Sequence, residues 1–74
     1  MYEVKCMYPN AMIQTLGHRK TAAQAKELMA AFKKQKAIYN GEFATEYWYQ
    51  KEGEDIPEYI RRITEWILDQ NARG

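Results

Sequence analysis

Residues 21–36, TAAQAKELMAAFKKQK, decide the fold of this chain. Five small or apolar side chains recur in them at three- and four-residue spacing: Ala22, Ala25, Leu28, Met29 and Phe32. At about 100° per residue they gather on one face of a helix. Thr21 can cap the free backbone N–H groups, and Gln24, three residues on, completes a capping-box arrangement. The pattern predicts a helix over 21–36 whose apolar face packs against the strands around it.

The residues before this helix have the alternation of strands. Tyr2, Val4, Cys6 and Tyr8 point one way, whereas Glu3, Lys5 and Met7 point the other. Pro9 and Asn10 are a turn signal, and residues 11–17 are predicted to return antiparallel to the first strand. The two faces of this second strand are almost equally apolar, so either could be the buried one. Residues 17–20 are predicted to form the loop into the helix.

A third strand and a second helix are predicted after Asn40 and Gly41, which break the chain. Residues 42–51 alternate, with Phe43, Thr45, Tyr47 and Tyr49 expected on the inner face and Ala44, Glu46, Trp48 and Gln50 on the outer one. The second helix is predicted to begin at Asp55, with Glu58 as its capping-box partner and Pro57 in its first turn. Its expected buried stripe consists of Ile56, Tyr59, Ile60, Ile63, Trp66 and Ile67. We expect residues 71–74 to fray.

These elements predict one α+β domain over residues 1–74, in the order strand, strand, helix, strand, helix. The simplest arrangement is two layers, with a three-stranded sheet and both helices packed on one face. The other face of the sheet is then expected to be open to solvent or to a partner.

Composition argues against several classes of protein. The 74 residues carry a formal net charge of +1, which does not favour a nucleic-acid coat or a membrane-surface peptide. The single cysteine cannot form an internal disulfide. A small domain without disulfide bonds is typical of a reducing compartment, so we expect a cytoplasmic protein. No apolar run is long enough to span a membrane, and the N-terminus has no signal-peptide pattern.

The sequence offers little support for catalysis. One cysteine and one histidine fall short of a zinc ligand set, and no cofactor motif is present. Cys6 is explained as a small core residue, which leaves His18 without a nucleophile partner. We therefore expect a protein that is not an enzyme.

The expected open sheet face provides the leading candidate site. Met7 and Trp48 are large for a solvated surface, and exposed apolar patches often mark contacts. The predicted partner-binding residues are Met7, Trp48, Glu46, Lys5, and on the second helix Arg61, Arg62 and Leu68. Two alternatives remain open: Trp48 lies over neighbouring aliphatic stems, or the third strand is flipped. If the face is open, Trp48→Ala should weaken partner binding and leave melting nearly unchanged.

A basic cluster provides the alternative site. Six cations lie on or beside the first helix: Arg19, Lys20, Lys26, Lys33, Lys34 and Lys36. They could follow a phosphate backbone while Trp48 or a tyrosine stacks on a base. The balanced net charge and the lack of an RNP-like aromatic motif count against this interpretation.

The leading hypothesis is a non-enzymatic protein-binding module that acts on another protein, or on a second copy of itself as a homodimer. In size and economy alone, the chain resembles the small accessory proteins with which phages and mobile elements bind and block host machinery. That resemblance implies an inhibitor or adaptor that occludes its partner, and it assigns no residue a role. A nucleic-acid-binding module is the alternative.

Overall fold

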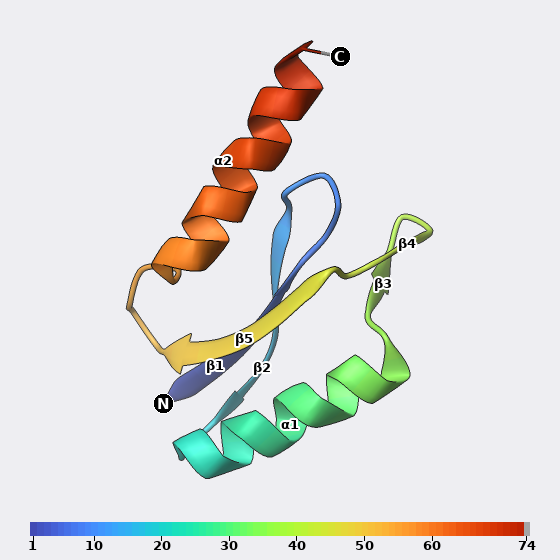
Figure 1. Cartoon of the computed structure of the whole chain (residues 1–74). Helices are drawn as coiled ribbons and strands as arrows, with labels where there is room; N and C mark the ends of the chain where they lie inside the picture. Colours follow the sequence, from blue (N-terminus) through green and yellow to red (C-terminus); the bar gives the residue numbers. More distant parts are fainter. Residues whose placement is uncertain (74) are drawn as a thin grey trace.

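A computed structural model, which describes residues 1–73, confirms the α+β class and the three-stranded sheet (Figure 1). The elements in chain order are β1 (Tyr2–Met7), β2 (Ile13–Arg19), α1 (Ala22–Gln35), β3 (Ile38–Tyr39), β4 (Glu42–Phe43), β5 (Glu46–Lys51) and α2 (Glu58–Arg73). The sheet is antiparallel in the order β2-β1-β5, so β1 is its central strand. The short strands β3 and β4 form a separate hairpin.

The β1–β2 hairpin forms as predicted, but β2 starts and ends later than expected. Ala11, at φ 69°, donates its N–H to the Tyr8 carbonyl at 2.9 Å, and Tyr8 donates to the Met12 carbonyl at 2.9 Å. The strand then runs from Ile13 to Arg19. Residues 17–19 were predicted to be a loop, but they pair with β1. The pairing extends to them because β1 begins at Tyr2, which is the partner of Arg19.

Helix α1 begins with the predicted Thr21 cap, which is one half of the predicted capping box. The Thr21 side-chain oxygen accepts a hydrogen bond from the Gln24 N–H at 3.2 Å. At the other end Lys36 adopts φ 62° and donates its N–H to the Phe32 carbonyl at 2.8 Å. The helix lies close to β2, since a Cβ added to Gly17 would stand 2.9 Å from a methyl group of Leu28.

Residues 42–51 do not form one strand. Asn40 and Gly41 have φ values of 52° and 80°, positive as a type I′ hairpin turn requires. Glu42 and Phe43 consequently pair back with Ile38 and Tyr39, and β5 begins only at Glu46. Phe43, which was expected on the inner face, is exposed.

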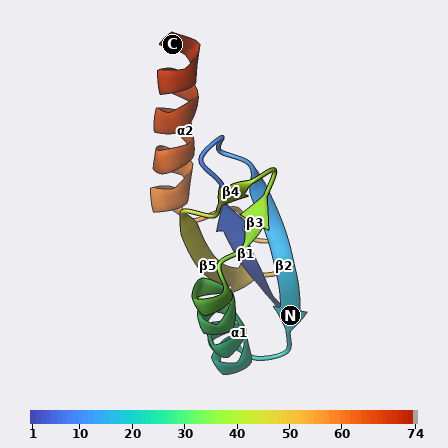
Figure 2. The ribbon, with the colours of Figure 1, turned by 90° about the vertical axis from the view of Figure 1, so that its right-hand side faces the viewer.

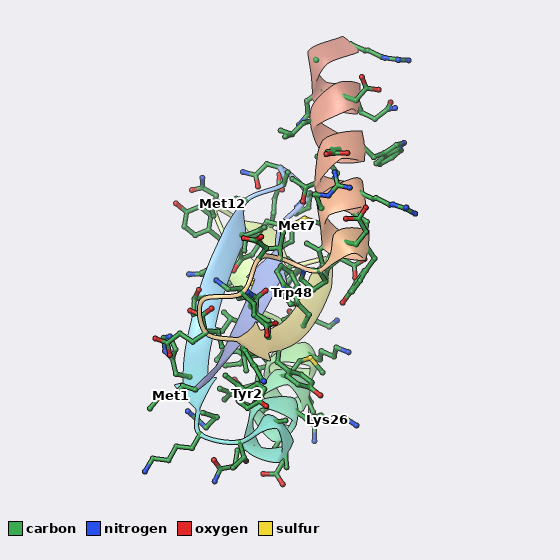
Figure 3. All side chains as sticks on the ribbon, turned by 90° about the vertical axis from the view of Figure 1, so that its left-hand side faces the viewer. Met1, Tyr2, Met7, Met12, Lys26 and Trp48 are labelled. Carbon is green, nitrogen blue, oxygen red and sulfur yellow. The ribbon has the colours of Figure 1, made fainter. Side chains whose placement is uncertain are left out.

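The prediction that both helices pack on one face of the sheet is wrong, because α1 and α2 lie on opposite faces (Figures 1 and 2). Residues paired across antiparallel strands point to the same side, so Trp48 shares a face with its partner Lys5. On that face Met7 and Trp48 form a buried cluster with Ile60 of α2. Half-buried isoleucines pack around this cluster: Ile13, Ile56, Ile63 and Ile67. Figure 3 shows Met7 and Trp48 at the base of α2, and Tyr2 beside α1.

Helix α2 begins and ends later than predicted. The Arg61 N–H donates to the Pro57 carbonyl at 3.0 Å, so Pro57 stands just before the first helical residue and Asp55 is outside the first turn. The helix continues to Arg73, where fraying was expected; Gly74 lies outside the described residues. Its second half extends past the sheet (Figure 1).

Candidate protein-binding surfaces

The face that was expected to be open is covered. Met7 is buried and Trp48 is only 3% exposed. The indole Nε1 donates to Gln50 Oε1 at 2.8 Å, and Gln50 Nε2 donates in turn to the Glu54 carbonyl at 2.6 Å. Met7 and Trp48 are therefore core residues, and the sequence-based prediction that they form a partner surface is corrected. Lys5, on the same face, is hydrogen-bonded through Nζ to Thr15 Oγ1 at 2.8 Å.

The three candidates on α2 are exposed but do not form one patch. Arg61 makes ion pairs with Glu58 and, at 2.6 Å, with Glu65. Leu68, 54% exposed, lies seven residues after Arg61 and so on the same side of the helix. Arg62 lies about 100° further round the helix, on another side.

Arg62 instead belongs to a row that the sequence analysis did not identify. Tyr59, Arg62 and Trp66 follow one another at three- and four-residue spacing, which places them along one line of the helix surface. Tyr59 is 52% exposed, the Arg62 side chain 76% and Trp66 63%. Tyr59 and Trp66 had both been assigned to the buried stripe, and both predictions are wrong. Tyr59 lies about 100° from the buried Ile60, and Trp66, six residues after Ile60, points about 120° away from it. This angle follows from the sequence spacing alone, and it indicates that Trp66 is exposed.

The row leads to a groove beside β5. About 300 Å³ in volume, this groove is lined by Met29, Lys33, Tyr47, Trp48, Tyr49 and Tyr59. Partial burial, and then the negative charge of Glu46, raises the pKa of Tyr59, so Glu46 borders the same region. Of the predicted partner residues, the structure brings Glu46 and Arg62 to this side of the molecule.

The six basic candidates are not gathered in one stripe. Lys26 and Lys33 are seven residues apart and share the flank of α1 that faces the groove. Lys34 is about 100° further round and points away. Arg19 donates to the carbonyl of its neighbour His18 at 2.7 Å, and Lys20 precedes the cap of α1. At the far end of α1, the Lys36 ammonium lies 5.9 Å from the centre of the Phe43 ring.

Two titratable residues away from the groove, Cys6 and Tyr8, lie in the core, and His18 lies at the surface. Burial raises the pKa of the Cys6 thiol, although hydrogen bonds with Tyr8 and the Gln14 backbone lower it. Burial and the neighbouring Cys6 raise the pKa of Tyr8 to about 12, and the Tyr8 hydroxyl donates to Gln14 Oε1 at 2.6 Å. His18 Nε2 stands 3.6 Å from Glu3 Oε1. Residues 1–73 contain no group of three or more His, Cys, Asp or Glu side chains placed to hold a metal ion.

Comparison with known proteins supplies no relative of this chain. No family model, curated protein or solved structure matches it. Over the described residues, neither helix has the length and apolar character needed to cross a membrane. The assignment of function depends on the exposed residues and contacts of the chain itself.

Proposed function

We propose that the chain is a non-enzymatic protein-binding module whose contact surface is the row of Tyr59, Arg62 and Trp66 on α2. The exposure of these three side chains in one line carries the proposal. Trp, Tyr and Arg are the residue types that dominate binding energy at protein interfaces. A tryptophan that is 63% exposed contributes apolar area that a partner can remove from water.

The row is also supported on the side that faces the sheet. Ile60, one position after Tyr59, is fully buried, and half-buried Ile63 packs on the same cluster, so the inner face of α2 is held in place. A contact surface on a rigid element loses less conformational entropy on binding than a loop does. A small module of this kind acts by covering part of its partner, as an inhibitor or adaptor in the cytoplasm does.

The proposal is tested by affinity capture with a matched pair of variants. Trp66→Ala and Leu68→Ala each remove an exposed apolar side chain from the projecting half of α2, on different sides of the helix. Each should change the free energy of unfolding by no more than about 0.5 kcal/mol. The tagged wild type and Leu68→Ala are expected to capture one stoichiometric partner from the cells that encode the protein, and Trp66→Ala is expected to lose it.

Two results would contradict this assignment. Capture that Trp66→Ala retains would show that the row is not the contact surface. Tight, salt-sensitive binding of labelled DNA or RNA, abolished by Lys33→Glu with Lys34→Glu, would favour the nucleic-acid alternative.

A further inference from the structure

Strand β5 is an edge strand, and its outer side has no strand partner within residues 1–73. The Glu52 N–H donates to the Met1 carbonyl at 2.8 Å, in the same register that pairs Tyr2 with Lys51. In an antiparallel ladder, hydrogen-bonded pairs alternate with non-bonded ones. The backbone groups that face β1 are therefore those of Glu46, Trp48 and Gln50. Those that face outward, away from the sheet, are those of Tyr47, Tyr49 and Lys51.

One of these outward groups already has a hydrogen-bond partner, and those of Tyr47 and Tyr49 lie beside the groove. The Lys51 carbonyl accepts a bond from the Glu54 N–H at 3.1 Å. The N–H and C=O groups of Tyr47 and Tyr49, whose side chains line the groove, are left for a ligand. Such a row of unpaired donors and acceptors matches one chemical partner, an extended polypeptide backbone.

Two helices form the walls of this site. On α1, Lys26, Met29 and Lys33 follow one another at three- and four-residue spacing, and the last two line the groove. On α2, Tyr59 lines the groove from the opposite side of the sheet and begins the row that continues through Arg62 and Trp66. An added strand would lie between the lysine row and the aromatic row.

The other edge of the sheet is less suited to pairing. The register between β1 and β2 shifts after Val4, which pairs with Gly17 while Lys5 pairs with Thr15. An irregularity of this kind leaves a residue unmatched and twists the strand, which protects an edge from further pairing. The pairing of β5 with β1 is regular from Glu46 to Lys51.

The charges around β5 define the partner. Lys26 and Lys33 on α1 and Lys51 on β5 outnumber Glu46. Arg62 on α2 is ion-paired with Glu58 at 3.4 Å and so adds no net charge. A second copy of the chain, paired antiparallel through β5, would bring Lys26 and Lys33 against the same two residues of its partner, and like charges in contact are unfavourable. We propose that β5 binds an extended acidic segment of the partner protein as an added strand. This inference rests on the proposed protein-binding function and names the part of the partner that enters the groove.

The test uses a short capped peptide of alternating glutamate and valine, titrated into the ¹⁵N-labelled protein and followed by NMR. We expect the largest shift changes and the greatest slowing of amide exchange at Tyr47 and Tyr49, with affinity falling as salt is raised. A peptide with lysine in place of glutamate should bind at least tenfold more weakly. Light scattering of the free protein at the same concentration checks for a dimer.

Two matched pairs of variants separate backbone pairing from charge. Tyr49→Pro and Tyr49→Ala both lose the ring, but only proline lacks the outward N–H, and an edge strand tolerates proline there. We expect Tyr49→Pro to bind the acidic peptide about tenfold more weakly than Tyr49→Ala. Should Tyr49→Pro not fold, Lys51→Pro against Lys51→Ala makes the same comparison. Lys33→Glu should weaken binding, whereas Lys34→Glu, which points away, should change affinity less than twofold.

Several outcomes would overturn the inference. These are absence of binding by the acidic peptide, equal binding of the lysine peptide, equal affinities of the two Tyr49 variants, and a dimer formed through β5. Failure here is distinguishable from failure of the proposed function. If Tyr49→Pro still captures the cellular partner and Trp66→Ala does not, the protein-binding function holds and strand addition is excluded.

Discussion

Trp48→Ala gives the sharpest test of how the molecule is built. The side chain is 3% exposed and belongs to the cluster that holds α2 on the sheet, together with Met7 and Ile60. Its removal leaves a cavity between α2 and the sheet. It also takes away the donor to Gln50 Oε1, a residue that is itself buried.

The expected loss is large compared with the stability of so small a domain. Substitution of a buried Trp by Ala typically lowers the free energy of unfolding by about 3–5 kcal/mol, and a domain of this size has roughly 5 kcal/mol in total. Each kcal/mol corresponds to about 4–8 °C in the melting temperature of a domain this short. Trp48→Ala should therefore be largely unfolded at 37 °C.

Urea unfolding followed by circular dichroism at 222 nm measures this loss, with Trp66→Ala as the matched control. We expect the control to stay within about 0.5 kcal/mol of wild type, since its side chain is exposed. A loss below about 1 kcal/mol for Trp48→Ala would refute the packing of α2 on this face. Such a small loss would instead favour the open sheet face that was predicted from the sequence.

Three further predictions follow from burial and pairing. The backbone N–H groups of Tyr47 and Tyr49 should exchange with deuterium rapidly and that of Trp48 slowly, because, of these three, only the Trp48 N–H faces β1. Equal protection of the three would contradict the assignment of the free edge. Cys6 should react with a thiol reagent at pH 8 only after unfolding, since it is buried and its pKa is raised; rapid labelling of the native protein would show otherwise. Tyr8, with its pKa raised to about 12 from 10.0, should ionise late in a titration at 295 nm. Because the unfolded chain releases that proton first, stability should fall between these two pH values and be unaffected by Tyr8 below them.

The local elements could be read from the sequence because short-range chemistry specifies them. Thr21 and the apolar spacing after it were sufficient for α1, and Pro9 with Asn10 for the first turn. Asn40 and Gly41 carried a hairpin signal too, but the β-rich run after them was interpreted as one long strand. The turn geometry proved stronger, and β3 and β4 pair with each other.

The placement of α2 could not be read in the same way. Strand alternation identifies two faces without saying whether one or both are buried, and here Met7 and Val4, on opposite faces of β1, are both fully buried. The polar residues on the Met7 face suggested an open surface, yet Gln50 is buried there through its hydrogen bonds to Trp48 and Glu54. Whether a face is covered depends on a helix distant in sequence. Because α2 covers this sheet face, the candidate surface lies on the flank of α2 and not on the sheet.

The order of strands in the sheet also affects how the protein is made. The central strand β1 comes first in the sequence, whereas β5 and α2, which complete the sheet and cover Met7, come last. During synthesis β1, β2 and α1 emerge while one face of the sheet is still bare. Long-range pairing of this kind delays folding, because a long loop must close before its contacts form. The growing chain thus leaves the apolar side chains around Met7 exposed until α2 has been synthesised and can pack on them.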